Sequence, residues 1–177
     1  MDWQAVYSFW EWSENKIGFF HMYMALVAVV LGPIIFLRRK GDFVHRLMGL
    51  VYVFAMLATN ITAFLIYDLT GGPNLFHIAA TISLITAIGG LVSILIYAEG
   101  KSQKALAMHI DFMSWSYFGL FLAAVAESVT SGFGPIIGDL SSFWMVFGIS
   151  MFIIGGIGSR ITRKLVNSTK RRWIEHL

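Results

Sequence analysis

Four histidines have the spacing of ligands that act in pairs at two depths of a membrane. Each lies near one end of a different apolar segment, and they are His21, His45, His77 and His109. Because successive membrane spans run in opposite directions, the first and third histidines are expected at one face and the second and fourth at the other. Ionisable groups at membrane depth are costly and usually mark function, and neutral imidazole is a common metal ligand. The pattern favours one pair of ligands at each face.

The number of ligands favours haem over a bare metal ion. Zinc takes at least three protein ligands even at an open site, whereas each predicted pair offers two imidazoles. Haem needs only two axial ligands, because its porphyrin already supplies four nitrogens. The sequence contains no cysteine, so thiolate metal sites, iron–sulfur clusters and disulfides are excluded. We therefore predict two non-covalent b-type haems with bis-histidine ligation, one held by His21 and His77 and the other by His45 and His109.

Two other interpretations of the histidines stay open. They could bind another metal or relay protons, or each could be a structural residue whose ring is satisfied by a nearby hydroxyl or carbonyl. Several neighbours share the helical face of His21 or of His45, namely Ala25, Ala28, Gly32, Gly49 and Tyr52. The small residues would leave room for a macrocycle, which Tyr52 would contact. Close helix packing also uses small residues and is the preferred explanation for these stripes taken alone.

Charged residues near the histidines suggest supporting roles. Arg46 could pair with a haem propionate, because guanidinium and carboxylate groups match bidentately, although membrane anchoring explains this arginine equally well. Asp111 is turned roughly 200° from His109 on a helix, so we expect it to meet an inner-face arginine or to take part in proton uptake. Since Lys16 is the only cation expected on the outer side, propionates there would need Trp, Ser, Thr or Asn donors.

The elements that position these residues are five apolar segments. About 20 residues at ~1.5 Å each cross a hydrocarbon layer of about 30 Å, and the sequence is 57% hydrophobic with 13% charged residues. The expected spans are residues 17–37, 47–67, 75–98, 106–126 and 142–159. Residues 1–16, with Trp3, Tyr7 and Trp10 at helical spacing, suit an amphipathic helix in the outer interface. Residues 160–177 form a basic tail that contains His176, which we expect to be solvated.

The fold class predicted is an all-α membrane protein with one domain of five transmembrane helices. Spans one and two, and then spans three and four, each carry an outer histidine followed by an inner one. Two such units inserted in the same direction are related by an axis along the membrane normal, as in parallel transporter repeats. Equivalent histidines would then face each other across that axis. We expect these four helices to form a haem-binding core, with the fifth helix at its periphery.

The distribution of basic residues predicts the orientation. Twelve of the 13 Lys and Arg residues fall on one side of the spans, and Lys16 alone falls on the other. Because basic residues are retained in the cytoplasm, we expect the N-terminus outside and the C-terminus inside. No cleavable signal peptide is apparent, since the first residues are acidic and aromatic. The net charge of +3 is then a topology signal, and no nucleic-acid partner is expected.

One stretch of sequence resembles a known family. Gly32-Pro33, the segment His45-Arg46-x-x-Gly49-x-x-Tyr52, and His109-x-x-Phe112-Met113-x-x-Ser116-Tyr117 are similar to the bacterial membrane proteins of the domain-of-unknown-function 2306 family. The resemblance covers roughly residues 18–125 and implies a bacterial cytoplasmic membrane as the location. The sequence departs from the family at Trp115, where an arginine often precedes the Ser-Tyr pair, and at Glu127. The family name supplies no activity.

The arrangement of helices and histidines also looks like that of the transmembrane, ascorbate-reducible di-haem b-type cytochromes. That resemblance implies the transfer of single electrons across the bilayer, which would make the protein a transmembrane oxidoreductase. The alternatives are a proton-coupled transporter or channel that uses the histidines as a relay, and a haem-binding anchor subunit of a larger electron-transfer complex. The sequence leaves open the donor and acceptor, which could be a quinol, a small reductant or a redox protein, and also whether the chain forms a homodimer.

Overall fold

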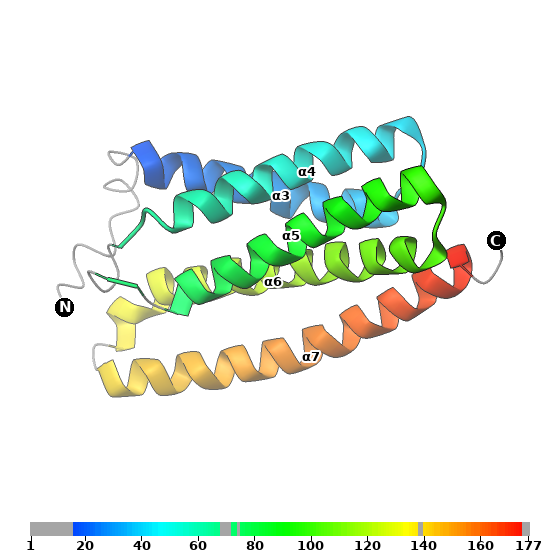
Figure 1. The fold of residues 1–177 in the computed structure, drawn as a ribbon. Coiled ribbons are helices and arrows are strands. Elements are labelled where there is room, and N and C mark those ends of the chain that lie inside the picture. Colours follow the sequence, from blue (N-terminus) through cyan, green and yellow to red (C-terminus); the bar gives the residue numbers. More distant parts are fainter. Residues whose placement is uncertain (1–15, 68–71, 74, 138–139, 175–177) are drawn as a thin grey trace.

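Five long helices make up the described part of the chain (Figure 1). The computed structural model describes residues 16–67, 72–73, 75–137 and 140–174, without the side chains of 130–144. The helices are α3 (Lys16–Leu37), α4 (Phe43–Ala63), α5 (Leu75–Gly100), α6 (Gln103–Ile137) and α7 (Leu140–Ile174). Each contains a stretch long and apolar enough to cross a membrane, as predicted. The predicted interfacial segment, apart from Lys16, and His176 lie outside the described residues.

The first four helices pack as a closed bundle. Neighbouring helices run in opposite directions, with α4 between α3 and α5, and α6 packed against α5 and also against α3 (Figure 1). In this ring α3 is diagonal to α5, and α4 is diagonal to α6. Helix α7 packs on the outside of α6, so the predicted peripheral position of the fifth helix is confirmed.

Capping interactions fix the turn between α3 and α4. Asp42 is the N-cap of α4, where its Oδ1 accepts a hydrogen bond from the His45 backbone N–H at 2.7 Å. This bond lowers the pKa of Asp42 below its ordinary value. Lys40 donates to the carbonyls of Ile35 and Phe36 at the end of α3, and burial lowers the pKa of its ammonium group. Gly41 has φ +80°, a conformation that favours glycine.

Three helices differ clearly from the predicted spans. Helix α6 covers 103–137 where the sequence suggested 106–126. Helix α4 covers 43–63 where the sequence suggested 47–67, because the Asp42 cap starts it early and residues 64–66 bond three residues back, as in a 3₁₀ turn. Helix α7 continues to Ile174 through the expected basic tail. Lys170 on this extension forms an ion pair with Asp111 of α6, so the tail is held against the bundle. The cation that meets Asp111 is therefore a lysine of the tail, where an arginine was expected.

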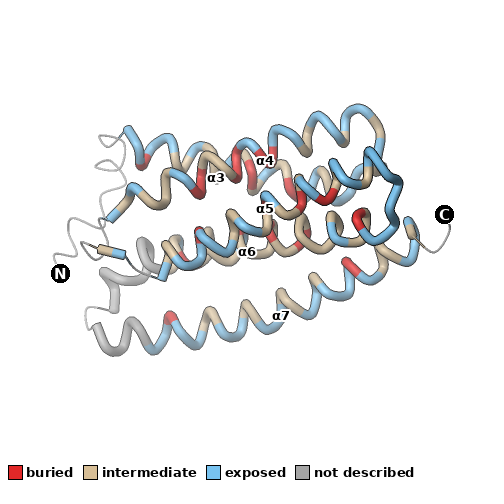
Figure 2. The backbone as a smooth tube through the Cα atoms, in the orientation of Figure 1, coloured by how far each residue is buried: buried red, intermediate tan, exposed pale blue. Residues whose placement is uncertain are grey.

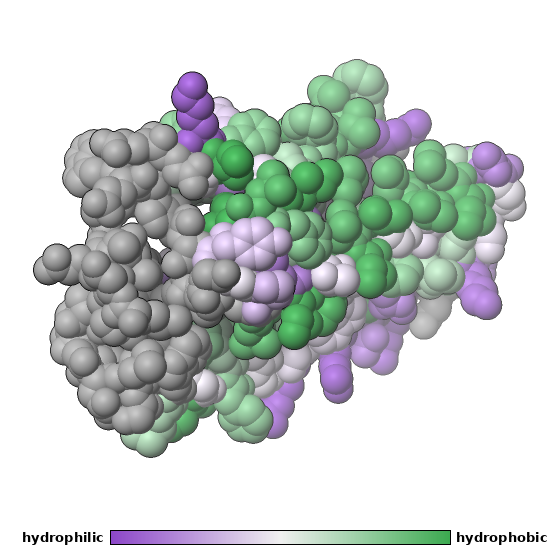
Figure 3. All heavy atoms as spheres, turned by 60° about the vertical axis from the view of Figure 1, so that its left-hand side comes forward, coloured by the Kyte–Doolittle hydropathy of each residue, from purple (hydrophilic) through white to green (hydrophobic). Residues whose placement is uncertain are grey.

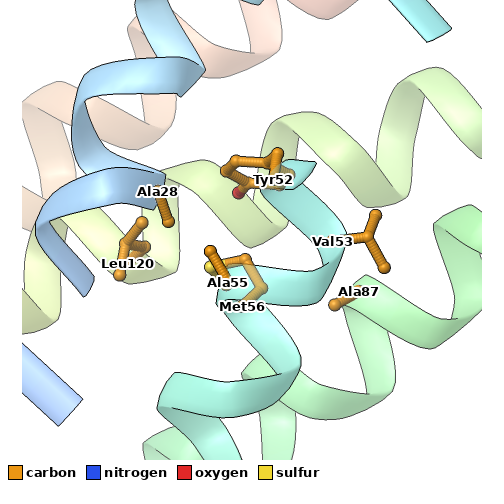
Figure 4. Packing of buried hydrophobic residues seen from close by; sticks show 7 residues of the cluster. All are labelled: Ala28, Tyr52, Val53, Ala55, Met56, Ala87 and Leu120. Carbon is orange, nitrogen blue, oxygen red and sulfur yellow. The ribbon is translucent and has the colours of Figure 1, made fainter. Parts of the chain in front are cut away.

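The core is small and lies in the middle of the bundle. Buried residues are few and lie mainly where helices face each other (Figure 2). One cluster combines residues of all four bundle helices: Ala28, Tyr52, Val53, Ala55, Met56, Ala87 and Leu120 (Figure 4). Apolar side chains also cover much of the described outer surface (Figure 3). This distribution suits a protein whose solvent is lipid, since an apolar exterior costs nothing in a hydrocarbon layer.

Candidate functional site

Three of the four candidate histidines lie on the inward side of their helices, and His77 lies at the edge of that side. Residues seven and eleven positions apart share one helical face, and His21 is related in this way to the buried residues Ala28 and Gly32. His45 has the same relation to Tyr52 and Met56, and His109 to Ser116 and Leu120. His77 lies three residues from buried Ala80, but Ile88, eleven residues further on, is 44% exposed. The helix faces therefore turn His21, His45 and His109 toward the interior, and all four histidines are partly buried.

The histidines occupy two ends of the bundle. His21 and His77 lie near the starts of α3 and α5, which we call the 21/77 end, and His45 and His109 lie near the starts of α4 and α6, the 45/109 end. Within each end the two helices are diagonal to each other in the ring.

Hydrogen bonds fix the tautomers of His109 and His21. The Nδ1 of His109 lies 2.8 Å from the carbonyl oxygen of Gly90 on α5. A carbonyl can only accept, so Nδ1 carries the proton and Nε2 keeps its lone pair. The Nδ1 of His21 lies 3.0 Å from the hydroxyl of Thr62 on α4, and that hydroxyl already donates to the Ala58 carbonyl at 2.7 Å. His21 is therefore also an Nδ1 donor with a free Nε2 lone pair, as in histidines that bind metals.

The other two histidines have different surroundings. The Nδ1 of His45 is buried and has no hydrogen-bond partner among the described residues. The ring of His77 stacks on Tyr67, with centroids 4.9 Å apart and planes inclined by 28°, and Phe64 lies nearby. Beside His77 an open groove of about 410 Å³ is lined by Phe64, Pro73, Leu75, Ile78 and Thr81. The 21/77 end is thus rich in aromatic and apolar contacts on the side of His77.

The small residues divide into two groups. A Cβ at Gly32 would overlap the ring of Tyr117, and one at Gly90 would overlap Met113. These glycines allow close helix contacts, which is the preferred explanation for the small-residue stripe that contains Gly32. A Cβ at Gly49, one turn from His45, would meet nothing within 4 Å. The space beside Gly49 is therefore open, on the face of α4 that also carries His45 and Tyr52.

The other predicted site residues make their own contacts. Arg46 donates from Nε and Nη2 to the Gly41 carbonyl at 3.1 and 3.0 Å, which leaves its Nη1 outside these bonds. Tyr52 lies in the core with its hydroxyl 3.0 Å from that of Ser116. The roles of Thr62 and Gly90 were not predicted from the sequence, and Ser116 was noted only as part of the family motif. Polar residues and glycines within apolar spans were the available signal, but their partners lie on other helices.

Within the described part of the chain, no group of three or more His, Asp or Glu side chains is placed to hold a metal ion. What these residues offer is two imidazoles at each end. That donor set fits haem, because the porphyrin completes the coordination of iron with two axial ligands. The free Nε2 atoms of His21 and His109 and the space beside Gly49 agree with such a fit.

Comparison with known proteins identifies the family. A family described as predicted membrane proteins, DUF2306, matches residues 18–155. The chain therefore belongs to this family, and the resemblance found in the sequence is confirmed. No curated protein and no solved structure matches the chain.

Proposed function

We propose that this chain, as a membrane protein of the DUF2306 family, is a di-haem b-type cytochrome that carries electrons across the cytoplasmic membrane. The observation that carries the proposal is the pair of Nδ1 hydrogen bonds, from His109 to the Gly90 carbonyl and from His21 to the Thr62 hydroxyl. Both bonds leave a lone pair on Nε2 of an inward-facing imidazole, the form that binds haem iron. One such residue stands at each end of the bundle.

The histidines would act as axial ligands in diagonal pairs, His21 with His77 and His45 with His109. Bound haem would supply one-electron redox chemistry, since its iron alternates between two oxidation states. Gly90 and Thr62 would orient two of the ligands and raise their basicity through the Nδ1 bonds. Arg46, through its remaining Nη1 group, is the residue we assign to a propionate at the 45/109 end.

The core between the two ends would keep the sites apart in a dry, rigid medium. Tyr52, Met56 and Leu120 fill the middle of the bundle, and at most 5% of each residue is exposed. Such a low-dielectric environment tunes reduction potentials and excludes water from the path between sites. Electrons could then pass from one end to the other without movement of the helices.

A reduced-minus-oxidised absorption spectrum of the purified full chain tests this function. We expect two six-coordinate, low-spin b-type haems per chain, with their content measured after extraction of the pigment. A colourless, folded preparation from haem-replete cells would contradict the proposal and favour the proton-relay alternative. Haem-loaded protein in vesicles that passes no electrons across the membrane by itself would instead indicate an anchor subunit.

The proposed orientation places the 21/77 end outside and the 45/109 end in the cytoplasm, on the strength of the twelve-to-one distribution of Lys and Arg. A reporter that is active only outside the membrane should give signal when fused after residue 72 and none after residue 40 or 102. The reverse result would exchange the two ends and with them the side of electron entry.

A further inference from the structure

Two adjacent polar side chains on α4 are buried, and each has a polar atom without a partner among the described residues. Thr59 is 7% exposed and Asn60 is 4% exposed, and within the described part of the chain neither the Thr59 Oγ1 nor the Asn60 Nδ2 has a hydrogen-bond partner. Buried polar groups are nearly always paired, because an unpaired one keeps the full cost of leaving water. Thr62, one turn further on, shows the usual solution, since its hydroxyl donates to the Ala58 carbonyl of its own helix.

Both side chains face the interior at the 21/77 end. Thr59 lies seven residues after Tyr52 and three after Met56, so it continues the buried face of α4. Asn60 lies seven residues after Val53, which packs with Ala87 of α5 in the core cluster (Figure 4). The Thr59 carbonyl lies 3.0 Å from the hydroxyl of Thr62, whose single proton it shares with the Ala58 carbonyl, and Thr62 is the residue that contacts His21. The unpaired hydroxyl and amide therefore lie beside the His21 site.

The two ends of the bundle differ in the number of cationic side chains near them. At the 45/109 end, Arg38, Lys40 and Arg46 surround the start of α4. At the 21/77 end, Lys16 is the only lysine or arginine near the described helix ends. A carboxylate bound at the 21/77 end would thus depend on neutral donors, and hydrogen bonds from neutral donors to a charged acceptor are stronger than those between neutral groups.

We infer that the Thr59 hydroxyl and the Asn60 amide form a donor pair for a propionate carboxylate of the haem at the 21/77 end. This inference rests on the proposed function and deepens it. Thr59 and Asn60 would bind a propionate at this end through neutral donors, as Arg46 is proposed to bind one at the 45/109 end through its guanidinium group. The pair also explains why two polar groups remain in an apolar part of α4, where valine and leucine would pack without the cost of desolvation.

The test compares Thr59→Val, Asn60→Leu and the double variant with the wild-type chain, each made by cell-free synthesis into lipid nanodiscs. Thr86→Val is the matched control, because the Thr86 hydroxyl already donates to the Ser83 carbonyl at 2.8 Å. The probes are haem and haem dimethyl ester, which lacks the carboxylate charges. The haem at the 21/77 end is identified as the one that His21→Leu removes.

We expect the wild-type chain to hold haem at this end more tightly than the ester, by about tenfold or more, as for a lost hydrogen bond to a charged group. The double variant should lose this preference for haem over the ester, and the reduction potential of this haem should shift. The Thr86→Val control should keep the wild-type preference and the wild-type potential. If the double variant keeps the wild-type preference and the wild-type potential, the assignment of Thr59 and Asn60 is wrong, while the proposed function still stands. A wild-type chain that binds no haem would instead overturn the proposed function.

Discussion

The hydroxyl oxygens of Tyr52 and Ser116 lie 3.0 Å apart in the buried centre of the bundle, each seven residues after a histidine of the 45/109 end. Tyr52 follows His45 on α4, and Ser116 follows His109 on the diagonal helix α6. The bond therefore joins equivalent positions of the two helix-pair repeats. It ties the diagonal helices together directly below the pair of histidines that they carry.

The direction of this bond predicts unequal effects of removing either partner. Ser116 donates to the Met113 carbonyl at 3.0 Å, so the Tyr52 hydroxyl is the donor to Ser116 Oγ. Tyr52→Phe removes the donor and leaves Ser116 satisfied, and should cost about 1 kcal/mol. Ser116→Ala strands a buried hydroxyl and should cost more, roughly 1–3 kcal/mol. Thermal unfolding in detergent measures both, with exposed Tyr23→Phe as the control; a larger loss for Tyr52→Phe would contradict this assignment.

The glycines provide a test of packing that is independent of any cofactor. Gly32→Ala should destabilise the fold by roughly 1–3 kcal/mol, because its Cβ overlaps the Tyr117 ring and the core must shift. Gly49→Ala should leave stability unchanged or raise it by about 0.5–1 kcal/mol, since its Cβ meets open space in a helix. Unfolding of the two variants side by side decides the matter. Equal losses at both positions would mean that α3 and α6 are not in the close contact described.

Thr62 should control the haem at the 21/77 end through the orientation of His21. Thr62→Val keeps the shape of the side chain but removes the acceptor of the His21 Nδ1 proton. We expect about a 10- to 100-fold loss of haem affinity at that end, the usual effect of losing such a supporting group. Thr62→Ser should restore binding because it restores the hydroxyl. Haem content and the low-spin spectrum report the outcome, and a spectrum unaffected by Thr62→Val would show that this bond does not support ligation.

The pairing of histidines makes a prediction about additivity. If His21 and His77 hold one haem, then His21→Leu, His77→Leu and the double variant should all lose the same spectral component, with little further loss in the double. Residues that act as a unit give non-additive effects, whereas separate sites add. His21→Leu combined with His45→Leu should abolish both components. Loss of different components from His21→Leu and His77→Leu would refute the diagonal pairs.

The sequence by itself determined the spans and the depth of the histidines. Hydropathy over windows of about 20 residues is set by the thickness of the hydrocarbon layer, so five helices could be located without contacts. The alternation of direction then assigned His21 and His77 to one end, and His45 and His109 to the other. Helix α4 begins four residues before the apolar segment predicted from hydropathy, because Asp42 caps its N-terminus ahead of that segment.

Only the tertiary structure decided which atoms support the imidazoles. The partners of His21 and His109 lie 41 and 19 residues away, on neighbouring helices, and one of them is a backbone carbonyl that any residue type would offer. Asp111 likewise meets Lys170 from a tail 59 residues away. Helical periodicity fixes the face on which a side chain lies, but the rotation and register of packed helices decide what that face meets. Those choices follow from contacts such as Tyr117 on Gly32, which hydropathy does not encode.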